Sequence, residues 1–264
     1  MNKWIILLVA IFAWSDLANA DEVVRYEQKL GATIPLEAVF QNEQGQAVSL
    51  RSLIKGPTVV VLAYYGCRNL CTWVLNGLVN SMSELSSRKF GLKLGHDYQV
   101  ITISIDPREK PRLALAKKRS YLARYGISEI THRADVDGWH FLTGTEDSIR
   151  KIADAVGFHY RIDPTSGGYS HPSGIVLVSP AGKITKYLLG VKFESDILRG
   201  ALLGAKAEKT SSFVDEILLL CSNGDPSATK VGAWALRLMR IAGAMSVVAL
   251  ALGLSWLVIK ESRV

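Results

Sequence analysis

A largely apolar run at 58–65, followed at once by a glycine and two cysteines, constrains this chain more than any other feature. The run has the continuous apolar character of a strand that is buried on both faces. After Gly66, apolar side chains over 67–86 recur at intervals of three and four, as they do on an amphipathic helix. Cys67 and Cys71 occupy positions i and i+4, so a helix that starts there places both sulfurs on one face. The sequence therefore predicts a strand that leads into a helix with two thiols in its first turn.

A distant histidine adds a third donor of the kind that metals bind. His171 lies in a Tyr-Ser-His-Pro sequence shortly before the apolar run 174–179, which has the pattern of another buried strand. Two thiols from one turn and an imidazole from a remote loop suit a single soft metal ion. We therefore take Cys67, Cys71 and His171 as candidate metal ligands.

The amino-terminal segment has the features of an export signal. Lys3 precedes the apolar stretch 4–14, and Ala18-Asn19-Ala20 supplies small residues of the signal-peptidase type. An uncleaved anchor is the alternative, but this apolar core is well short of the ~20 residues that a spanning helix needs. We expect residues 1–20 to be a signal peptide and the mature chain to begin at Asp21.

A second apolar block near the other end predicts a membrane anchor. The range 241–259 contains no charged residue, and its helical length comes close to the thickness of the hydrocarbon core. A buried core helix is the alternative. Because the export signal carries the preceding domain out of the cytoplasm, we expect a single-pass protein of the cell inner membrane. Its globular domain would lie on the periplasmic side, with 225–240 as membrane-proximal linker and 260–264 as cytoplasmic tail.

The remaining range, 21–224, is long enough for one domain with its own core. It alternates predicted strands and helices and ends in a hairpin and a helix, the order of a thioredoxin-like α/β fold with helices on both faces of a sheet. The segment around Trp139, His140 and Phe141 is expected to be a loop. The other predicted elements are an N-terminal β-hairpin (36–40 and 46–50), strands 58–65 and 98–105, helices 67–86, 111–125, 146–156 and 194–205, and a second hairpin (174–179 and 183–189).

Three segments together resemble the Sco/SenC family. They are Tyr-Tyr-Gly-Cys-Arg-Asn-Leu-Cys ending at Cys71, Ser-Ile-Asp-Pro ending at Pro107, and Ser-His-Pro around His171. Members of this family are thioredoxin-like copper proteins that assist assembly of the copper A site of cytochrome c oxidase. The resemblance implies that Cys67, Cys71 and His171 bind copper and that the chain is a copper metallochaperone. Its implied partners are the oxidase subunit that carries the copper site and a copper donor protein.

The chemistry of the donor set agrees with that resemblance. Thiolates suit Cu(I), and imidazole also accepts Cu(II), so a mixed site can hold either oxidation state. Arg68, where many family members have proline, and the start of a helix are expected to favour the thiolate form of the cysteines.

Other functions of the same thiols stay open. Cys67 and Cys71 can be the redox pair of a thiol-disulfide oxidoreductase that reduces the cysteines of the oxidase copper site. They can also form a structural disulfide, which is common in exported proteins. A thiol peroxidase that uses Cys67 is a third reading.

The remaining reactive residues have simpler interpretations. Asp106 is expected to cap the segment after its strand, although the family pattern also allows a role beside the site. Cys221 is expected to be a buried, inert thiol. Pro172 is a candidate for a cis proline. The other histidines are expected to be surface or locally hydrogen-bonded residues: His96, His132, His140 and His159.

The basic residues do not indicate a nucleic-acid partner. The formal net charge is +7, but the basic side chains are dispersed and export would separate the protein from nucleic acid. A cluster on the predicted helix 111–125 is expected to be a solvated face, with docking to an acidic oxidase surface as the alternative. Its members are Lys110, Arg112, Lys117, Lys118, Arg119 and Arg124.

Overall fold

The computed structural model describes residues 24–67, 70–127 and 136–210, together with Ile241, Gly243, Met245 and Ser246. Among these residues, none of the helices has the length and apolar character needed to cross a bilayer. The predicted signal peptide 1–20 and linker 225–240 lie outside the described residues. So do the tail 260–264 and, apart from the four isolated residues, the predicted span 241–259.

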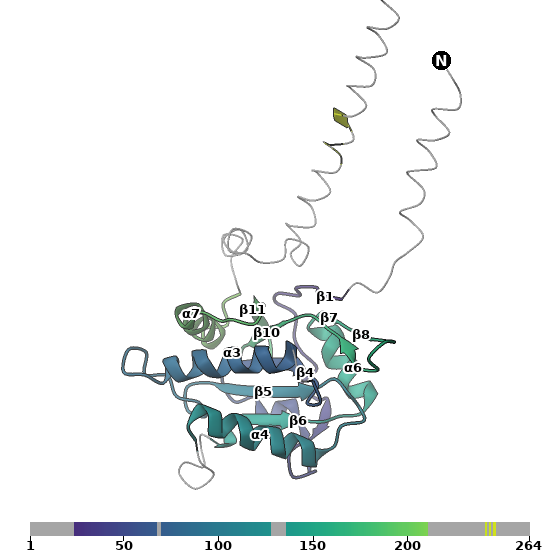
Figure 1. Ribbon diagram of the computed structural model, residues 1–264. Coiled ribbons are helices and arrows are strands. Elements are labelled where there is room, and N and C mark those ends of the chain that lie inside the picture. The colour runs from purple at the N-terminus through teal and green to yellow at the C-terminus, as the bar shows by residue number, and fades with distance from the viewer. Residues whose placement is uncertain are drawn as a thin grey trace, which may run out of the picture.

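A five-stranded mixed sheet forms the centre of the domain, with strand order β11-β10-β4-β5-β6 (Figure 1). β4, β5 and β6 run parallel to one another, whereas β10 pairs antiparallel with both β4 and β11. This order, with helical crossovers between the parallel strands, confirms the predicted thioredoxin-like arrangement. The strands are β4 (Thr58–Ala63), β5 (Gln99–Ser104), β6 (Trp139–Leu142), β10 (Gly174–Val178) and β11 (Ile184–Leu189).

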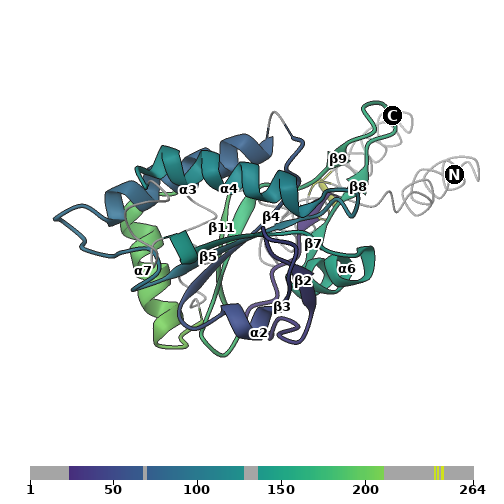
Figure 2. The same ribbon diagram turned by 90° about the horizontal axis from the view of Figure 1, so that it is seen from below.

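Helices cover both faces of the sheet, as predicted (Figure 2). Alternate residues of β4 point to opposite faces: Val59 and Val61 pack with α3, α4 and α7, whereas Val60 and Leu62 pack with α6 and the N-terminal segment. Every residue of β4 is buried, as its uniform apolar sequence requires. The helices are α2 (Leu50–Leu53), α3 (Leu70–Leu85), α4 (Pro111–Tyr125), α6 (Glu146–Ala155) and α7 (Ser195–Lys206).

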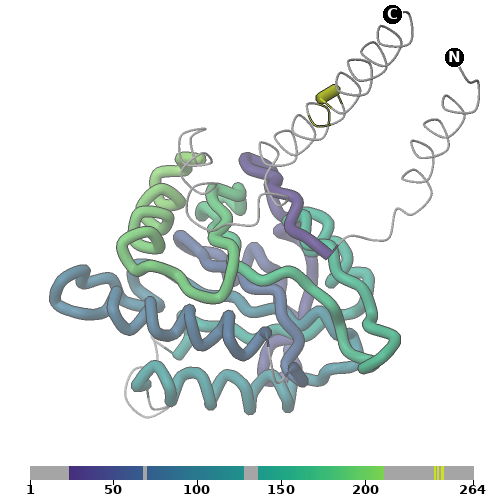
Figure 3. Tube along the Cα trace, turned by 45° about the horizontal axis from the view of Figure 1, so that its top comes forward, coloured from purple at the N-terminus to yellow at the C-terminus, as the bar shows by residue number. Residues whose placement is uncertain are grey.

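Smaller strand pairs complete the domain. The predicted N-terminal hairpin is confirmed as β2 (Val39–Gln41) paired antiparallel with β3 (Ala47–Ser49). The amino-terminal β1 (Arg25–Tyr26) lies alongside β7 (Phe158–His159), far along the chain (Figure 3). A short ribbon of β8 (Arg161–Ile162) and β9 (Tyr169–Ser170) then leads directly to His171.

One predicted loop is an element of the sheet. Trp139, His140 and Phe141 belong to β6, the edge strand beside β5, so the expectation of a loop there is wrong. The indole of Trp139 is fully buried and donates a hydrogen bond to the Thr102 hydroxyl on β5 at 3.0 Å. Burial of these aromatic side chains against α4 stabilises an edge strand of only modest length.

A buried ion pair joins the N-terminal hairpin to α4. The Glu43 carboxylate lies 3.0 Å from the Lys118 ammonium, and the two side chains are 1% and 7% exposed. Glu43 also accepts a 2.8 Å hydrogen bond from the backbone N–H of Phe141. Lys118 is therefore not part of a solvated basic face as predicted, although Arg112, Arg119 and Arg124 on the same helix are exposed.

Candidate metal centre

The three candidate ligands meet at the carboxyl end of β4. Cys67 follows the strand in a short turn, in which its N–H donates to the Tyr64 carbonyl at 3.2 Å. Cys71 lies in the first turn of α3, which begins at Leu70. The expectation that both thiols lie in one helical turn is therefore wrong, since Cys67 precedes the helix. The two sulfurs nevertheless lie close together.

The donor atoms of Cys67, Cys71 and His171 all lie within 4.8 Å of one another. Cys71 Sγ and His171 Nε2 lie 2.8 Å apart. All three side chains are buried, with Cys71 only 2% exposed. No disulfide joins Cys67 and Cys71. The structure therefore brings together, from segments far apart in the sequence, the donor set that the sequence predicts.

The orientation of the imidazole leaves one ring nitrogen for a metal. His171 Nδ1 lies 2.8 Å from the carbonyl oxygen of Pro172, which can only accept, so Nδ1–H is the donor. In the neutral ring Nε2 then carries the lone pair, and it faces the Cys71 sulfur. A backbone carbonyl that fixes the tautomer in this way is the usual outer partner of a metal-binding histidine.

Aromatic rings hold the imidazole in place. Phe158 stacks on the His171 ring at 5.9 Å between centroids, and Tyr64 meets it edge-on at 6.0 Å. The peptide bond before Pro172 is trans, since the described residues contain no cis peptide bond. The idea of a cis proline beside the thiols is therefore wrong.

Burial sets the proton affinities of the metal-free site. It lowers the pKa of His171, which favours the neutral, ligating imidazole. It also raises the pKa of the Cys71 thiol, so the expected preference for thiolate is wrong at Cys71 in the absence of metal. Arg68, from which that expectation came, lies outside the described residues. Metal binding at Cys71 must therefore displace the thiol proton.

A small expansion makes the site fit one metal ion. With metal–sulfur and metal–nitrogen bonds of the lengths common in zinc sites, a sulfur and a nitrogen on one ion lie roughly 3.6 Å apart. The observed 2.8 Å between Cys71 Sγ and His171 Nε2 is that of a direct hydrogen bond. The two atoms thus need to separate by less than about 1 Å to admit a metal.

Comparison with known proteins places the chain in a family. The family model described as SCO1/SenC matches residues 31–200, a range that contains all three candidate ligands.

The chain belongs to the SCO1/SenC family.

The SCO1 protein homolog of Bacillus subtilis (strain 168) is 26% identical over 156 residues, which are 58% of this chain and 72% of that protein. A putative electron transfer protein from Aquifex aeolicus VF5 has a similar structure, with a TM-score of 0.56 and 23% identity over 68% of this chain and 95% of its own. Arabidopsis thaliana ScoI, solved with copper bound, gives a TM-score of 0.50 and 18% identity over 68% and 99%. These structural likenesses support the thioredoxin-like fold.

Two acidic residues that follow β5 in this SCO1/SenC protein have different roles. Asp106 accepts hydrogen bonds from the backbone N–H of Arg108 at 2.9 Å and from its guanidinium at 2.8 Å, which confirms the predicted local cap. Glu109 instead points toward the ligand turn, where its carboxylate accepts from the N–H groups of Tyr65 and Gly66. The sequence pattern does not single out Glu109, and only its position shortly after the Asp-Pro pair indicates this end of the sheet.

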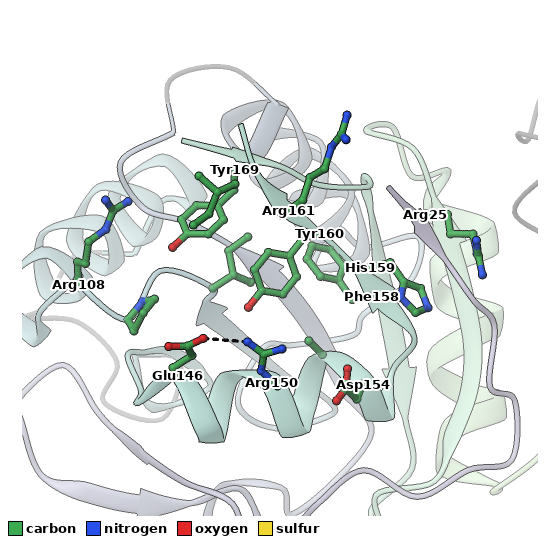
Figure 4. A pocket seen from close by; sticks show the side chains of 14 residues that line it. Arg25, Arg108, Glu146, Arg150, Asp154, Phe158, His159, Tyr160, Arg161 and Tyr169 are labelled. Carbon is green, nitrogen blue, oxygen red and sulfur yellow. Dashed lines mark hydrogen bonds and ion pairs between the residues drawn. The ribbon is translucent and has the colours of Figure 1, made fainter. Parts of the chain in front are cut away.

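A cavity of about 770 Å³ is lined in part by Phe158, whose ring also stacks on His171 (Figure 4). The SCO1/SenC site and this cavity share the wall formed by Phe158 and Tyr169. Arg108 lies at one end and Arg25 at the other, and the Glu146–Arg150 ion pair of α6 lies along one side. None of the three candidate ligands lines the cavity, so it is a neighbour of the site and no part of it.

The other histidines of this SCO1/SenC chain and Cys221 either lie apart from the candidate ligands or fall outside the described residues. His159 is paired with Glu27 at 3.2 Å, as expected of a locally hydrogen-bonded residue. His140 is partly buried, and its Nδ1 lies 4.0 Å from the Glu43 carboxylate, with no hydrogen-bond partner in the described part of the chain. His96 is exposed. His132 and Cys221 lie outside the described residues.

Proposed function

We propose that this protein binds one copper ion through Cys67, Cys71 and His171. The observation that carries the proposal is the convergence of two thiols and one imidazole within 4.8 Å in a buried site. Two sulfurs provide the soft donors that Cu(I) prefers, and the nitrogen also serves Cu(II). Membership of the SCO1/SenC family and the copper bound in the related Arabidopsis protein support copper over other soft metals.

The copper is cargo in this proposal, and the protein is a metallochaperone. It receives copper from a donor protein and passes it to the subunit of cytochrome c oxidase that carries the copper A site. The neutral His171 offers Nε2 without losing a proton, whereas the Cys71 thiol releases one as copper arrives. During transfer, sulfur and nitrogen donors of the partner replace the three ligands stepwise, and the released thiolates take up protons again.

The proposal includes a membrane tether on the periplasmic side of the cell inner membrane. The resemblance of residues 1–20 to a signal peptide and the uncharged apolar range 241–259 support it. A tether confines the chaperone to the surface in which its oxidase partner is embedded, which raises the effective concentration of one for the other.

A second function is supported by the thiols themselves. The sulfurs of Cys67 and Cys71 lie close together and are not joined in a disulfide, so the pair can act as a dithiol. Such a pair would reduce a disulfide of the oxidase copper site by thiol–disulfide exchange. Two thiol protons and two electrons pass to the substrate disulfide, and a Cys67–Cys71 disulfide remains.

Replacing His171 by alanine separates the two functions. The copper affinity of the variant is expected to fall by at least about tenfold. Removal of a residue that only hydrogen-bonds to a metal ligand already lowers metal affinity 10- to 100-fold, and His171 is itself a proposed ligand. Its exchange with glutathione disulfide should fall much less, since both sulfurs remain. Copper affinity is measured by competition with a Cu(I) chelator, and thiol exchange by the rate of mixed-disulfide formation.

The matched control is His96→Ala, which removes an exposed imidazole remote from the ligands. It should leave both measurements unchanged. A His171→Ala protein that holds copper as tightly as the parent rules out the three-ligand site. A parent protein that exchanges thiols with glutathione disulfide but holds no copper would instead favour the reductase.

A further inference from the structure

We propose that Glu109 is the positioning residue of the copper site and that its negative charge favours Cu(II) relative to Cu(I) there. The effect of the charge on the copper oxidation state rests on the proposed copper function. The positioning role, in which Glu109 fixes the turn before Cys67, applies to the metal-free protein as well.

The Glu109 carboxylate binds two consecutive backbone N–H groups directly before Cys67. Oε2 accepts from Tyr65 N–H at 2.8 Å, and Oε1 accepts from Gly66 N–H at 2.7 Å. A third donor, the Ser104 hydroxyl at the end of β5, lies 2.6 Å from Oε2. Both carboxylate oxygens are therefore engaged, and the carboxylate links the end of β5 to the turn after β4.

This contact fixes the backbone from which Cys67 projects. Cys67 lies outside the helix, so the regular hydrogen bonds of α3 do not orient it. Its N–H donates to the Tyr64 carbonyl, and the preceding two N–H groups both bind Glu109. The sulfur position thus depends on a turn whose consecutive amides are held by one side chain.

The charge of Glu109 has a second effect on a bound metal. The groups that donate hydrogen bonds to the Glu109 carboxylate are two backbone N–H groups and a hydroxyl, and none of them carries a charge that would offset that of a carboxylate. Asp106, the other acidic residue of this loop, is paired with the Arg108 guanidinium. An anion in a partly buried position stabilises a doubly charged ion more than a singly charged one. The ratio of Cu(II) to Cu(I) affinity should therefore depend on Glu109.

Two substitutions in the full-length chain separate position from charge. Glu109→Ala removes both the hydrogen bonds to the turn and the negative charge. It is expected to lower Cu(I) affinity about 10- to 100-fold, the usual loss when a residue that supports a metal ligand by hydrogen bonding is removed. Glu109→Gln keeps an acceptor oxygen but no charge. Its NH2 group cannot accept a hydrogen bond, so it can hold only one of the two amides. We expect it to recover part of the Cu(I) affinity while the Cu(II)/Cu(I) affinity ratio falls roughly tenfold. Affinities are measured by chelator competition for each oxidation state.

Amide hydrogen exchange of the metal-free protein tests the positioning role without copper. The Tyr65 and Gly66 amides should exchange at least about tenfold faster in Glu109→Ala than in the parent. If the parent binds no copper, the proposed function fails while this result stands. If the parent binds copper and both amides exchange in Glu109→Ala as in the parent, the positioning role fails alone.

The control and a second variant complete the test. Glu37→Ala removes a carboxylate from an exposed pair with Arg51 and should change none of these quantities. Ser104→Ala removes one donor to Glu109 and should shift Cu(I) affinity in the same direction as Glu109→Ala, by less. A Cu(II)/Cu(I) affinity ratio that is unchanged in folded Glu109→Gln overturns the charge effect.

Discussion

The double variant Cys67→Ser/Cys71→Ser should retain less than about a tenth of an equivalent of copper, because it lacks the soft donors that hold Cu(I). Only the imidazole of His171 remains in the site. Serine has nearly the shape of cysteine, so the buried turn keeps its packing while the donor atoms change from sulfur to hydroxyl oxygen. Copper per chain is measured after loading under reducing conditions and gel filtration, with circular dichroism to verify the fold.

Single Cys→Ser variants test each sulfur separately, and Cys221 provides a control thiol. Each single Cys→Ser change should weaken copper binding by more than about tenfold, since each leaves one sulfur and one nitrogen. Cys221→Ser is the matched thiol control and should bind one copper like the parent. A double variant that still holds stoichiometric copper would show that the metal lies elsewhere.

Replacing Glu43 by alanine is expected to lower the free energy of unfolding by about 3 to 5 kcal/mol, the usual cost of breaking a buried ion pair by removing one partner. Lys118 would be left as a charge that is 7% exposed and has lost the carboxylate at 3.0 Å. The backbone N–H of Phe141 on β6 would also lose its acceptor. The loss is measured by urea unfolding of the full-length chain, followed by circular dichroism.

Removing both charges together provides the control. In Glu43→Met/Lys118→Met no unpaired charge remains, and apolar groups of similar volume fill the space, so this variant should be more stable than Glu43→Ala. Glu146→Ala breaks a pair whose side chains are 69% and 68% exposed, and it should have a far smaller effect. A loss below about 1 kcal/mol for Glu43→Ala would contradict a structural role for the pair.

Much of the fold follows from patterns that lie within one segment. The continuous apolar run of β4, the turn between β2 and β3, and the proline that starts α4 each determine a local structure. The predicted helix 111–125 has the observed bounds, and both predicted hairpins are present. These elements depend on hydrophobic periodicity and on turn residues, which the sequence displays directly.

The features that the sequence does not predict depend on contacts between distant segments. β6 is short and was expected to be a loop, because its strand conformation comes from pairing with β5 and packing against α4. Glu43 lies in a turn, where an acidic residue is normally exposed, and only the folded position of Lys118 accounts for its burial. Glu109 is similar, since nothing near it in the sequence indicates the two amides that it binds.

The candidate ligands were predicted from spacing and residue type, and the structure brings them together. The position of Cys67 outside the helix was not foreseen, because the start of a helix depends on the turn that precedes it. The proton state of Cys71 was not foreseen either, because burial depends on the packed surroundings of the sulfur.

The burial of the three donor side chains has a kinetic consequence. A small chelator in solution can reach an ion held there only after the protein opens, so the leakage rate is set by that opening and not by chelator strength. A docked partner that displaces the turn around Cys67 would expose the ion and present its own donors in the same event. Shielding the ion from solvent in this way makes its release dependent on the recipient.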